Sequence, residues 1–244
     1  MLRKLKLFLI RKTKALSLKL NIHFVFEPIS GILINLAYLS KFSKWRKEHS
    51  NPKFNDFYSK KFNFNKRYNL YNFLIEEEKL ESEDINYFEF GVCTGASFKW
   101  WIEHNKNSNS KFNGFDTFEG LPENWNIYKK GDMSTDGKVP IINDNRHNFE
   151  IGLFQQSLPA FIKKFNFESK RNVINMDADL YSSTIYVLSS LFPYLKKDDI
   201  IVFDEFGVPT HEFRAFNDFF NSFNLKYELL AASNNYYQIA VKIL

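Results

Sequence analysis

The stretch NMDADLYSST, residues 175–184, ends an apolar run (VINM) with two carboxylates and then begins a helix. Aspartate is a poor strand residue and is costly to remove from water, so two of them at a strand end indicate a functional role. Side chains two positions apart in an extended segment face the same side, so Asp177 and Asp179 can both reach one crevice above a sheet. The stretch therefore predicts a buried strand that ends in a binding site.

Strand-like and helix-like segments alternate on both sides of this stretch. The expected strands are 87–92, 111–118, 148–154, 172–179 and 198–207, followed by 225–232 and 236–244 around the turn-like cluster SNN. One intervening helix, SLPAFIKKF, is expected to begin with Ser157 as its N-cap. The alternation predicts an α/β fold with a mostly parallel sheet, helices on both faces and a C-terminal antiparallel hairpin.

Acidic residues stand at the ends of three expected strands: Asp116, Asp177 with Asp179, and Asp204 with Glu205. Ligands of such sheets bind at the carboxyl ends of the strands, near the point where the strand order reverses. Converging carboxylates repel one another unless a cation lies between them, and oxygen ligands suit Mg²⁺, Mn²⁺ or Ca²⁺ better than zinc. The pattern predicts a binding site, with a hard divalent cation as one occupant.

The segment EFGVCTGAS, residues 89–97, places two glycines between an expected strand and an expected helix. Its spacing is G-x-x-x-G, which differs from the dinucleotide fingerprint and lacks the Walker lysine, so NAD and nucleotide triphosphates are disfavoured. Asp116 lies at the end of the next strand, where a carboxylate can accept hydrogen bonds from both hydroxyls of a ribose. A tight turn without a ligand, and a turn-capping role for Asp116, remain alternatives.

The segments EFGVCTGAS, FDTFEGLPENW, INMDADLYSST and IVFDEFG resemble, in order and spacing, class I S-adenosylmethionine (SAM)-dependent methyltransferases. In particular they resemble the macrocin O-methyltransferase (TylF-like) family, which methylates sugar hydroxyls. The resemblance covers about residues 66–244 and implies a Rossmann-like methyltransferase domain there, with residues 1–65 as a basic, helical extension. It implies SAM as cofactor and a sugar-containing acceptor.

The resemblance also implies roles for individual residues. Asp177 would act as the catalytic base, and Asp177, Asp204 and Glu205 would hold Mg²⁺. The last metal position is usually Asp or Asn, so Glu205 leaves open whether the metal is bound. Asp179 is expected to cap the following turn rather than to act in catalysis, and a helix-capping role remains the alternative for Asp177. The residues expected to contact SAM are Glu89, Gly91, Thr94, Gly95, Ser97, Asp116 and Ser157.

Three features outside these motifs carry further expectations. Residues 119–147 lack periodicity, which predicts a loop that closes over SAM or acceptor, with Trp125 and Tyr128 as contacts. His211 is expected to be an exposed residue of a helix's first turn, with an alternative base or a substrate contact as the other interpretations. Other readings of the chain are a metal-independent small-molecule or N-methyltransferase, and a catalytically idle SAM-fold partner in glycan assembly.

Charge and cysteine content bear on location and partners. The single cysteine, Cys93, excludes an intrachain disulfide and favours a reducing, cytoplasmic setting. The first 20 residues hold seven Lys/Arg and no acid; without them the chain has 26 basic and 28 acidic residues, so no nucleic-acid face is indicated. The N-terminus predicts either a basic helix on an anionic membrane surface or an arm packed on the domain or a dimer partner.

Overall fold

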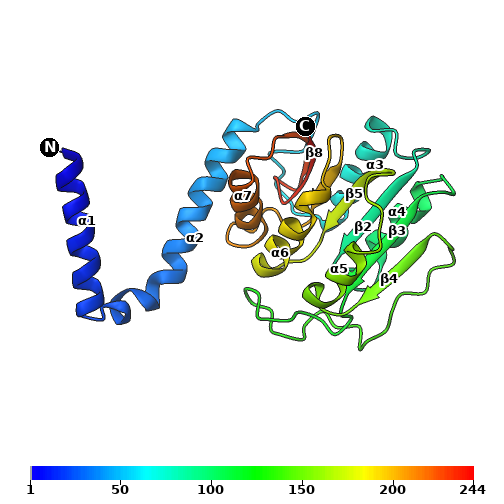
Figure 1. Cartoon of the computed structure of the whole chain (residues 1–244). Helices are drawn as coiled ribbons and strands as arrows, with labels where there is room; N and C mark the ends of the chain where they lie inside the picture. Colours follow the sequence, from blue (N-terminus) through cyan, green and yellow to red (C-terminus); the bar gives the residue numbers. More distant parts are fainter. Residues whose placement is uncertain (1) are drawn as a thin grey trace.

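The computed structural model describes residues 2–244 and contains one sheet of eight strands (Figure 1). The strand order is β1-β7-β8-β6-β5-β2-β3-β4; β8 runs antiparallel to both of its neighbours, and the other pairs are parallel. This arrangement confirms the predicted mostly parallel sheet and its C-terminal hairpin. The strands are β1 Phe54–Asn55, β2 Ile85–Phe90, β3 Lys111–Asp116, β4 His147–Ile151, β5 Arg171–Met176, β6 Ile200–Phe203, β7 Tyr227–Ser233 and β8 Gln238–Ile243.

The strand order reverses between β2 and β5. From β2 the chain adds β3 and β4 on one side, and then β5 and β6 on the other. In the register of the sheet, Phe90 at the end of β2 pairs with Phe115 of β3 and with Met176 of β5. The three carboxyl ends are therefore level, and they leave a crevice of the kind in which α/β sheets bind ligands.

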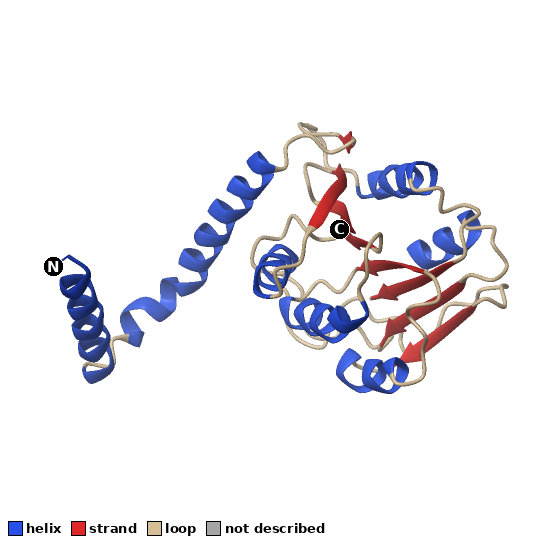
Figure 2. Ribbon diagram, turned by 45° about the horizontal axis from the view of Figure 1, so that its top comes forward, coloured by secondary structure: helices blue, strands red, loops and turns tan. Residues whose placement is uncertain are grey.

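Helices cover both faces of the sheet (Figure 2), as the sequence predicts. The face that carries Tyr87 packs against α3 (Arg67–Glu77) and α4 (Ala96–His104). The face that carries Phe88 and Phe90 packs against α5 (Phe154–Ile162), α6 (Tyr181–Leu191), α7 (Glu212–Ser222) and the end of α2. Because both faces are covered, all six residues of β2 (INYFEF) are buried, including the polar Asn86 and Glu89. Two short 3₁₀ turns, Phe64–Lys66 and Phe192–Tyr194, complete the elements.

The N-terminal segment forms two helices, α1 (Leu2–Lys19) and α2 (His23–Glu48), that project from the body of the protein (Figure 1). Only the C-terminal part of α2 packs on the domain: Trp45 is buried and donates a hydrogen bond from Nε1 to the Tyr227 hydroxyl at 2.8 Å. Within residues 2–244 no single helix has the length and apolar character to cross a membrane. By those criteria α1 and α2 qualify only together, as a pair bent by 115°.

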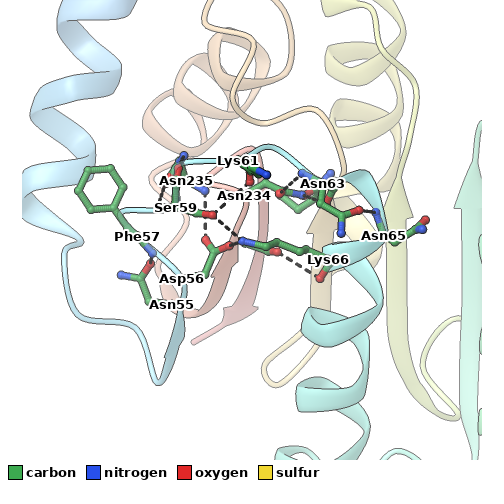
Figure 3. A network of polar contacts seen from close by, with 12 residues as sticks. Asn55, Asp56, Phe57, Ser59, Lys61, Asn63, Asn65, Lys66, Asn234 and Asn235 are labelled. Carbon is green, nitrogen blue, oxygen red and sulfur yellow. Dashed lines mark hydrogen bonds and ion pairs between the residues drawn. The ribbon is translucent and has the colours of Figure 1, made fainter.

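Residues 50–66 connect α2 to the domain and are held against the turn between β7 and β8 (Figure 3). The Ser59 amide donates to Asn235 Oδ1 at 2.7 Å, and the Asn63 amide donates to Asn234 Oδ1 at 3.2 Å. These two asparagines belong to the SNN cluster, which is a turn as predicted. Contacts with the sheet thus begin before residue 66, and the division of the chain at residues 65 and 66 stays a prediction.

The start of α5 differs from the prediction that Ser157 is its N-cap. The helix begins at Phe154, and Ser157 lies inside it, with its hydroxyl donating to the Leu153 carbonyl at 3.2 Å. The Gln156 side chain accepts a hydrogen bond from the Leu153 amide, so a glutamine takes part in the cap expected of a serine. Pro159 then falls in the second turn, where its missing N–H frees only the carbonyl of Gln155, an exposed residue.

Candidate functional site

A cavity of ≈ 670 Å³ lies at the carboxyl ends of β2, β3 and β5, at the reversal of strand order. Its volume is in the range of small-molecule and cofactor sites. Several segments that are distant in sequence line it: Gly91–Thr94, Ala96 and Ser97 from the glycine loop, Asp116, Asp177–Asp179, Glu205, Arg67 with Phe64, Gly120–Glu123 with Met133, and Gly152–Gln156. The expected contact Ser157 is buried in α5 and does not line the cavity, whereas its neighbours Gln155 and Gln156 do.

The glycine loop follows β2, and its backbone favours glycine at two positions, Gly91 and Gly95. Gly91 has φ +96°, and a Cβ there would lie 1.8 Å from the carbonyl oxygen of Asp177. Gly95 has φ +79°, and a Cβ there would lie 2.8 Å from Pro140. A side chain is therefore excluded at Gly91 by conformation and by the close approach of the backbone that follows β5. This approach places the loop directly beside Asp177.

Asp116 at the end of β3 holds the glycine loop in place through hydrogen bonds to its backbone. Its Oδ2 accepts hydrogen bonds from the amides of Val92 (2.8 Å) and Cys93 (2.7 Å), and its Oδ1 accepts from the Phe118 amide at 2.7 Å. Each carboxylate oxygen can accept more than one hydrogen bond, and Asp116 also lines the cavity. The turn-capping role is thus present, and contact with a ribose stays a prediction that this geometry allows.

Glu89 lies below the glycine loop, fully buried, and does not line the cavity. It accepts hydrogen bonds from the Ser97 hydroxyl at 2.9 Å and from the Tyr87 hydroxyl. Ser97 does line the cavity, so Glu89 positions a cavity residue instead of reaching a ligand itself. Burial raises the pKa of Glu89 from its ordinary 4.5 to about 7.

We expect the variant Glu89→Gln to gain stability relative to the native chain as the pH rises. Below pH 4.5 Glu89 is protonated in both the folded and the unfolded state; between its unfolded pKa of 4.5 and its folded pKa of about 7 only the folded state holds the proton. Stability is therefore lost through this window in the native chain and kept in the variant, a difference of roughly 3 kcal/mol above pH 7. Urea unfolding of both proteins at pH 4.5 and pH 8 measures it; an equal difference at the two pH values would contradict the burial effect.

Three carboxylates form the acidic cluster, Asp177, Asp179 and Glu205, and each offers an oxygen within 4.8 Å of the others. Asp179 and Glu205 are buried, and Asp177 is half-buried. The expectation that Asp179 caps the DLYSST turn is wrong: among the described residues, its side chain makes no hydrogen bond to that backbone, and the N-cap of α6, Leu180, makes no side-chain cap either. Asp179 has φ +58°, a left-handed conformation, and its carboxyl group lies with those of Asp177 and Glu205 in the acidic cluster.

Asp204 lies beside the acidic cluster but is paired with an arginine. Arg67 Nη1 is 3.2 Å from Asp204 Oδ2 and 3.7 Å from Asp177 Oδ2. The Arg67 guanidinium also stacks on the Phe64 ring at 4.2 Å. Sequence reasoning missed Arg67, and expected Asp204 to be a metal ligand. The structure brings Asp177 and Glu205 together as predicted and places Asp179, not Asp204, as the third member of the acidic cluster.

Burial dominates the electrostatics of this region. It raises the pKa of Asp177 and of Glu205 well above their usual range, and the charge of Asp204 adds to both shifts. Burial likewise raises the pKa of Asp179 to about 7 and that of Asp204 to about 6. Carboxyl groups in such a setting bind either protons or a cation near neutral pH. Oxygen Oε2 of Glu205 is buried without a hydrogen-bond partner, so the acidic cluster suits a hard divalent cation.

His211 is half-buried, and the expectation of an exposed histidine is wrong. The amide of Tyr181, in the first turn of α6, donates to His211 Nδ1 at 3.3 Å. One of the free N–H groups of that helix end is therefore satisfied by a side chain 30 residues away, which no local pattern reveals. Burial lowers the pKa of His211, which keeps its ring neutral and able to accept this bond.

The long connection between β3 and β4 is irregular, as predicted, and folds back on itself. Trp125 is buried in a small apolar cluster with Leu121 and Leu180, and Tyr128 stacks on Trp125 at 5.2 Å. Neither aromatic residue lines the cavity, whereas Leu121 does. Trp125 therefore anchors the loop beside the start of α6, and the cavity contacts of the loop come from Gly120–Glu123 and Met133.

Part of the chain that forms this sheet and cavity matches the model of a known protein family. Residues 138–235, from the end of the long loop to the β7–β8 turn, match the model of the macrocin O-methyltransferase (TylF) family. The similarity to the TylF family is therefore shown for this segment. The predicted resemblance to this family is confirmed over that segment, and together with the fold it supports a SAM-dependent methyltransferase.

Two solved methyltransferase structures share the fold of this chain. CalS11, a calicheamicin methyltransferase, is 20% identical and superimposes with a TM-score of 0.54 over 73% of this chain and 77% of its own. The O-methyltransferase NovP is 16% identical, with a TM-score of 0.51 over 71% of this chain and 78% of its own. At these identities the likeness shows the fold alone. No curated protein sequence matches the chain.

Proposed function

We propose that the chain transfers a methyl group from SAM to a hydroxyl of a sugar, on a glycan or a glycosylated metabolite. One observation carries the proposal: the acidic cluster lies in the same cavity as the glycine loop, so a proton acceptor and a cofactor-binding loop converge on one space. The descriptions of the matching family and of one structural neighbour support a sugar as the acceptor. The family is named for macrocin O-methylation, and CalS11 is described as a TDP-rhamnose 3'-O-methyltransferase.

The cavity suits SAM in size and in the polar groups that it presents. We propose that the Gly91–Ser97 loop holds the methionine portion, with Ser97 fixed by Glu89, and that Asp116 accepts hydrogen bonds from the ribose. The half of the cavity bordered by Gly152–Gln156 is left for the adenine, with Gln155 and Gln156 as its polar contacts in place of Ser157. Bound SAM supplies a methyl group on a positively charged sulfur, which is already an activated electrophile.

The chain's own task is then to prepare a weakly acidic sugar hydroxyl. Asp177 has the position for it, because it lines the cavity beside the glycine loop and its raised pKa makes it a competent proton acceptor. The hydroxyl proton would move to the Asp177 carboxylate as the oxygen takes up the methyl group. Arg67, 3.7 Å from Asp177, would hold the carboxylate in place and balance its charge before the proton arrives.

We further propose that Asp177, Asp179 and Glu205 hold a divalent cation such as Mg²⁺, with Asp204 as the partner of Arg67. A bound cation would lower the pKa of the acceptor hydroxyl and fix its position. The ion pair between Arg67 and Asp204 favours a second candidate, a metal-independent methyltransferase on the same site, because a protein cation already offsets one of the buried carboxylates.

A calorimetric titration with SAM, repeated with Mg²⁺ and with EDTA, separates these candidates. We expect SAM to bind under all conditions, since the glycine loop and Asp116 lie outside the acidic cluster. Methyl transfer to a panel of nucleotide-activated sugars should fall about 100-fold or more in EDTA and return with Mg²⁺. Transfer that is indifferent to EDTA would select the metal-independent enzyme. Absence of SAM binding would leave the idle SAM-fold protein as the better description.

A further inference from the structure

Helix α1 combines strong positive charge with an apolar stripe. Its sequence holds seven Lys/Arg and no acid, and every residue of it except the half-buried Ser17 is exposed. Leu2, Leu5, Leu9 and Leu16 follow one another at helical spacings of three, four and seven, which places them on one side of the helix. The remaining surface mixes the seven basic side chains with further exposed apolar ones, Leu7, Phe8, Ile10 and Leu18. A helix of this composition suits a surface that is both apolar and negatively charged.

The first half of α2, residues 23–38, is apolar around its whole circumference. Phe24, Ile32 and Leu36 expose 65%, 62% and 57% of their surface, and Glu27 is the single acid of this half. A helix that is apolar all round is normally buried, yet none of residues 23–37 is buried in the structure. Further large apolar side chains exposed on this half are Val25, Phe26, Ile29, Leu33 and Ile34.

Basic residues flank this apolar half on both sides. Helix α1 precedes it, and exposed Lys41, Lys44 and Lys47 follow it, around the buried Trp45 that contacts Tyr227 of the domain. Its 16 residues span about 24 Å as a helix, less than the roughly 30 Å of a bilayer's hydrocarbon core. The segment can therefore dip into one leaflet with positive charge at the headgroup level on either side, and long lysine side chains can reach those headgroups.

We propose that residues 2–38, the docking arm, bind the surface of an anionic lipid bilayer and hold the methyltransferase domain next to it. The apolar half of α2 enters the acyl boundary, and α1 lies along the headgroups. A second copy of the chain fits less well, because two α1 helices would repel each other and the rest of the chain, with 26 basic and 28 acidic residues, offers no strong negative counterpart. A bilayer with anionic lipids supplies both the apolar interior and the charge.

Flotation of the full-length protein with lipid vesicles tests the proposal. The protein should float with vesicles of phosphatidylcholine and phosphatidylglycerol, and far less with phosphatidylcholine alone. The triple variant Arg11→Glu, Lys12→Glu, Lys14→Glu should lower partitioning by about 100-fold or more, since each basic residue near an anionic surface contributes roughly a factor of five. The variant Ile32→Glu, Leu36→Glu should lower partitioning by removing the apolar contact.

Matched variants on the domain serve as controls. Lys163→Glu with Lys164→Glu removes exposed charge after α5, and Ile141→Glu alters an apolar residue that is 99% exposed in the long loop. Both should float like the native chain. Equal flotation with neutral and anionic vesicles, or no flotation at all, would overturn the proposal. So would a lipid-free dimer, seen by sedimentation velocity, that Ile32→Glu with Leu36→Glu dissociates, because the docking arm would then be covered by a second copy.

Discussion

The variant Asp177→Asn should lose methyl transfer by about 10²- to 10⁴-fold in kcat while SAM affinity stays nearly unchanged. Asparagine keeps the size of the side chain but cannot accept the hydroxyl proton. Gly91 of the glycine loop lies against the backbone carbonyl of Asp177, and that group is retained in the variant. Calorimetry gives the SAM affinity, and release of S-adenosylhomocysteine in the presence of a sugar acceptor gives kcat.

Two further variants serve as a control and separate the role of the proposed base from that of the acidic cluster. Asp198→Asn changes an exposed aspartate in the connection before β6 and should leave both quantities unchanged. Asp179→Asn removes a member of the acidic cluster without removing the proposed base. Its loss of kcat should therefore become smaller when the Mg²⁺ concentration is raised. The loss of kcat in Asp177→Asn should not change with Mg²⁺. Turnover retained in Asp177→Asn would refute its role as base. A parallel loss of SAM binding would point to a structural role for Asp177 instead.

The parts of the structure that could be predicted are those in which sequence neighbours decide the outcome. Alternating strand and helix patterns fixed the mostly parallel sheet and its closing hairpin. The glycine loop could be predicted because a strand end, a turn and a helix start lie within nine residues, 89–97. The convergence of the acidic residues could be predicted because parallel strands bring their carboxyl ends to one edge of the sheet. Local chemistry and sheet geometry were sufficient for these features.

The parts that could not be predicted depend on pairs that are far apart along the chain. Arg67 and Asp204 are 137 positions apart, so nothing in the sequence near either residue indicates that the arginine forms an ion pair with this carboxylate. Asp204 is thus paired with Arg67, and the acidic cluster consists of Asp177, Asp179 and Glu205. The cap of α6 by His211 and the burial of Trp125 have the same origin, because each depends on which loop crosses a helix end. Tertiary contact overrides local capping preference in these cases.

The variant Gly91→Ala should destabilise the protein by about 3–5 kcal/mol and abolish SAM binding. A left-handed conformation costs a residue with a side chain roughly 1–3 kcal/mol, and overpacking against a fixed neighbour adds about as much. Here φ is +96°, and the neighbour is the Asp177 carbonyl oxygen, 1.8 Å from the new methyl group, in backbone that cannot move without shifting the end of β5. Urea unfolding followed by tryptophan fluorescence measures the loss.

Gly131→Ala separates the two causes. Gly131 has a similar φ of +89°, but a Cβ there meets nothing within 4 Å, so this variant should show the conformational cost alone, about 1 kcal/mol, and bind SAM normally. The difference between the two variants then measures how firmly the glycine loop is held against the strand end that carries Asp177. Equal losses in both would mean that the loop yields to the methyl group, and the site would not have the fixed geometry on which a proton acceptor beside a bound sulfonium depends.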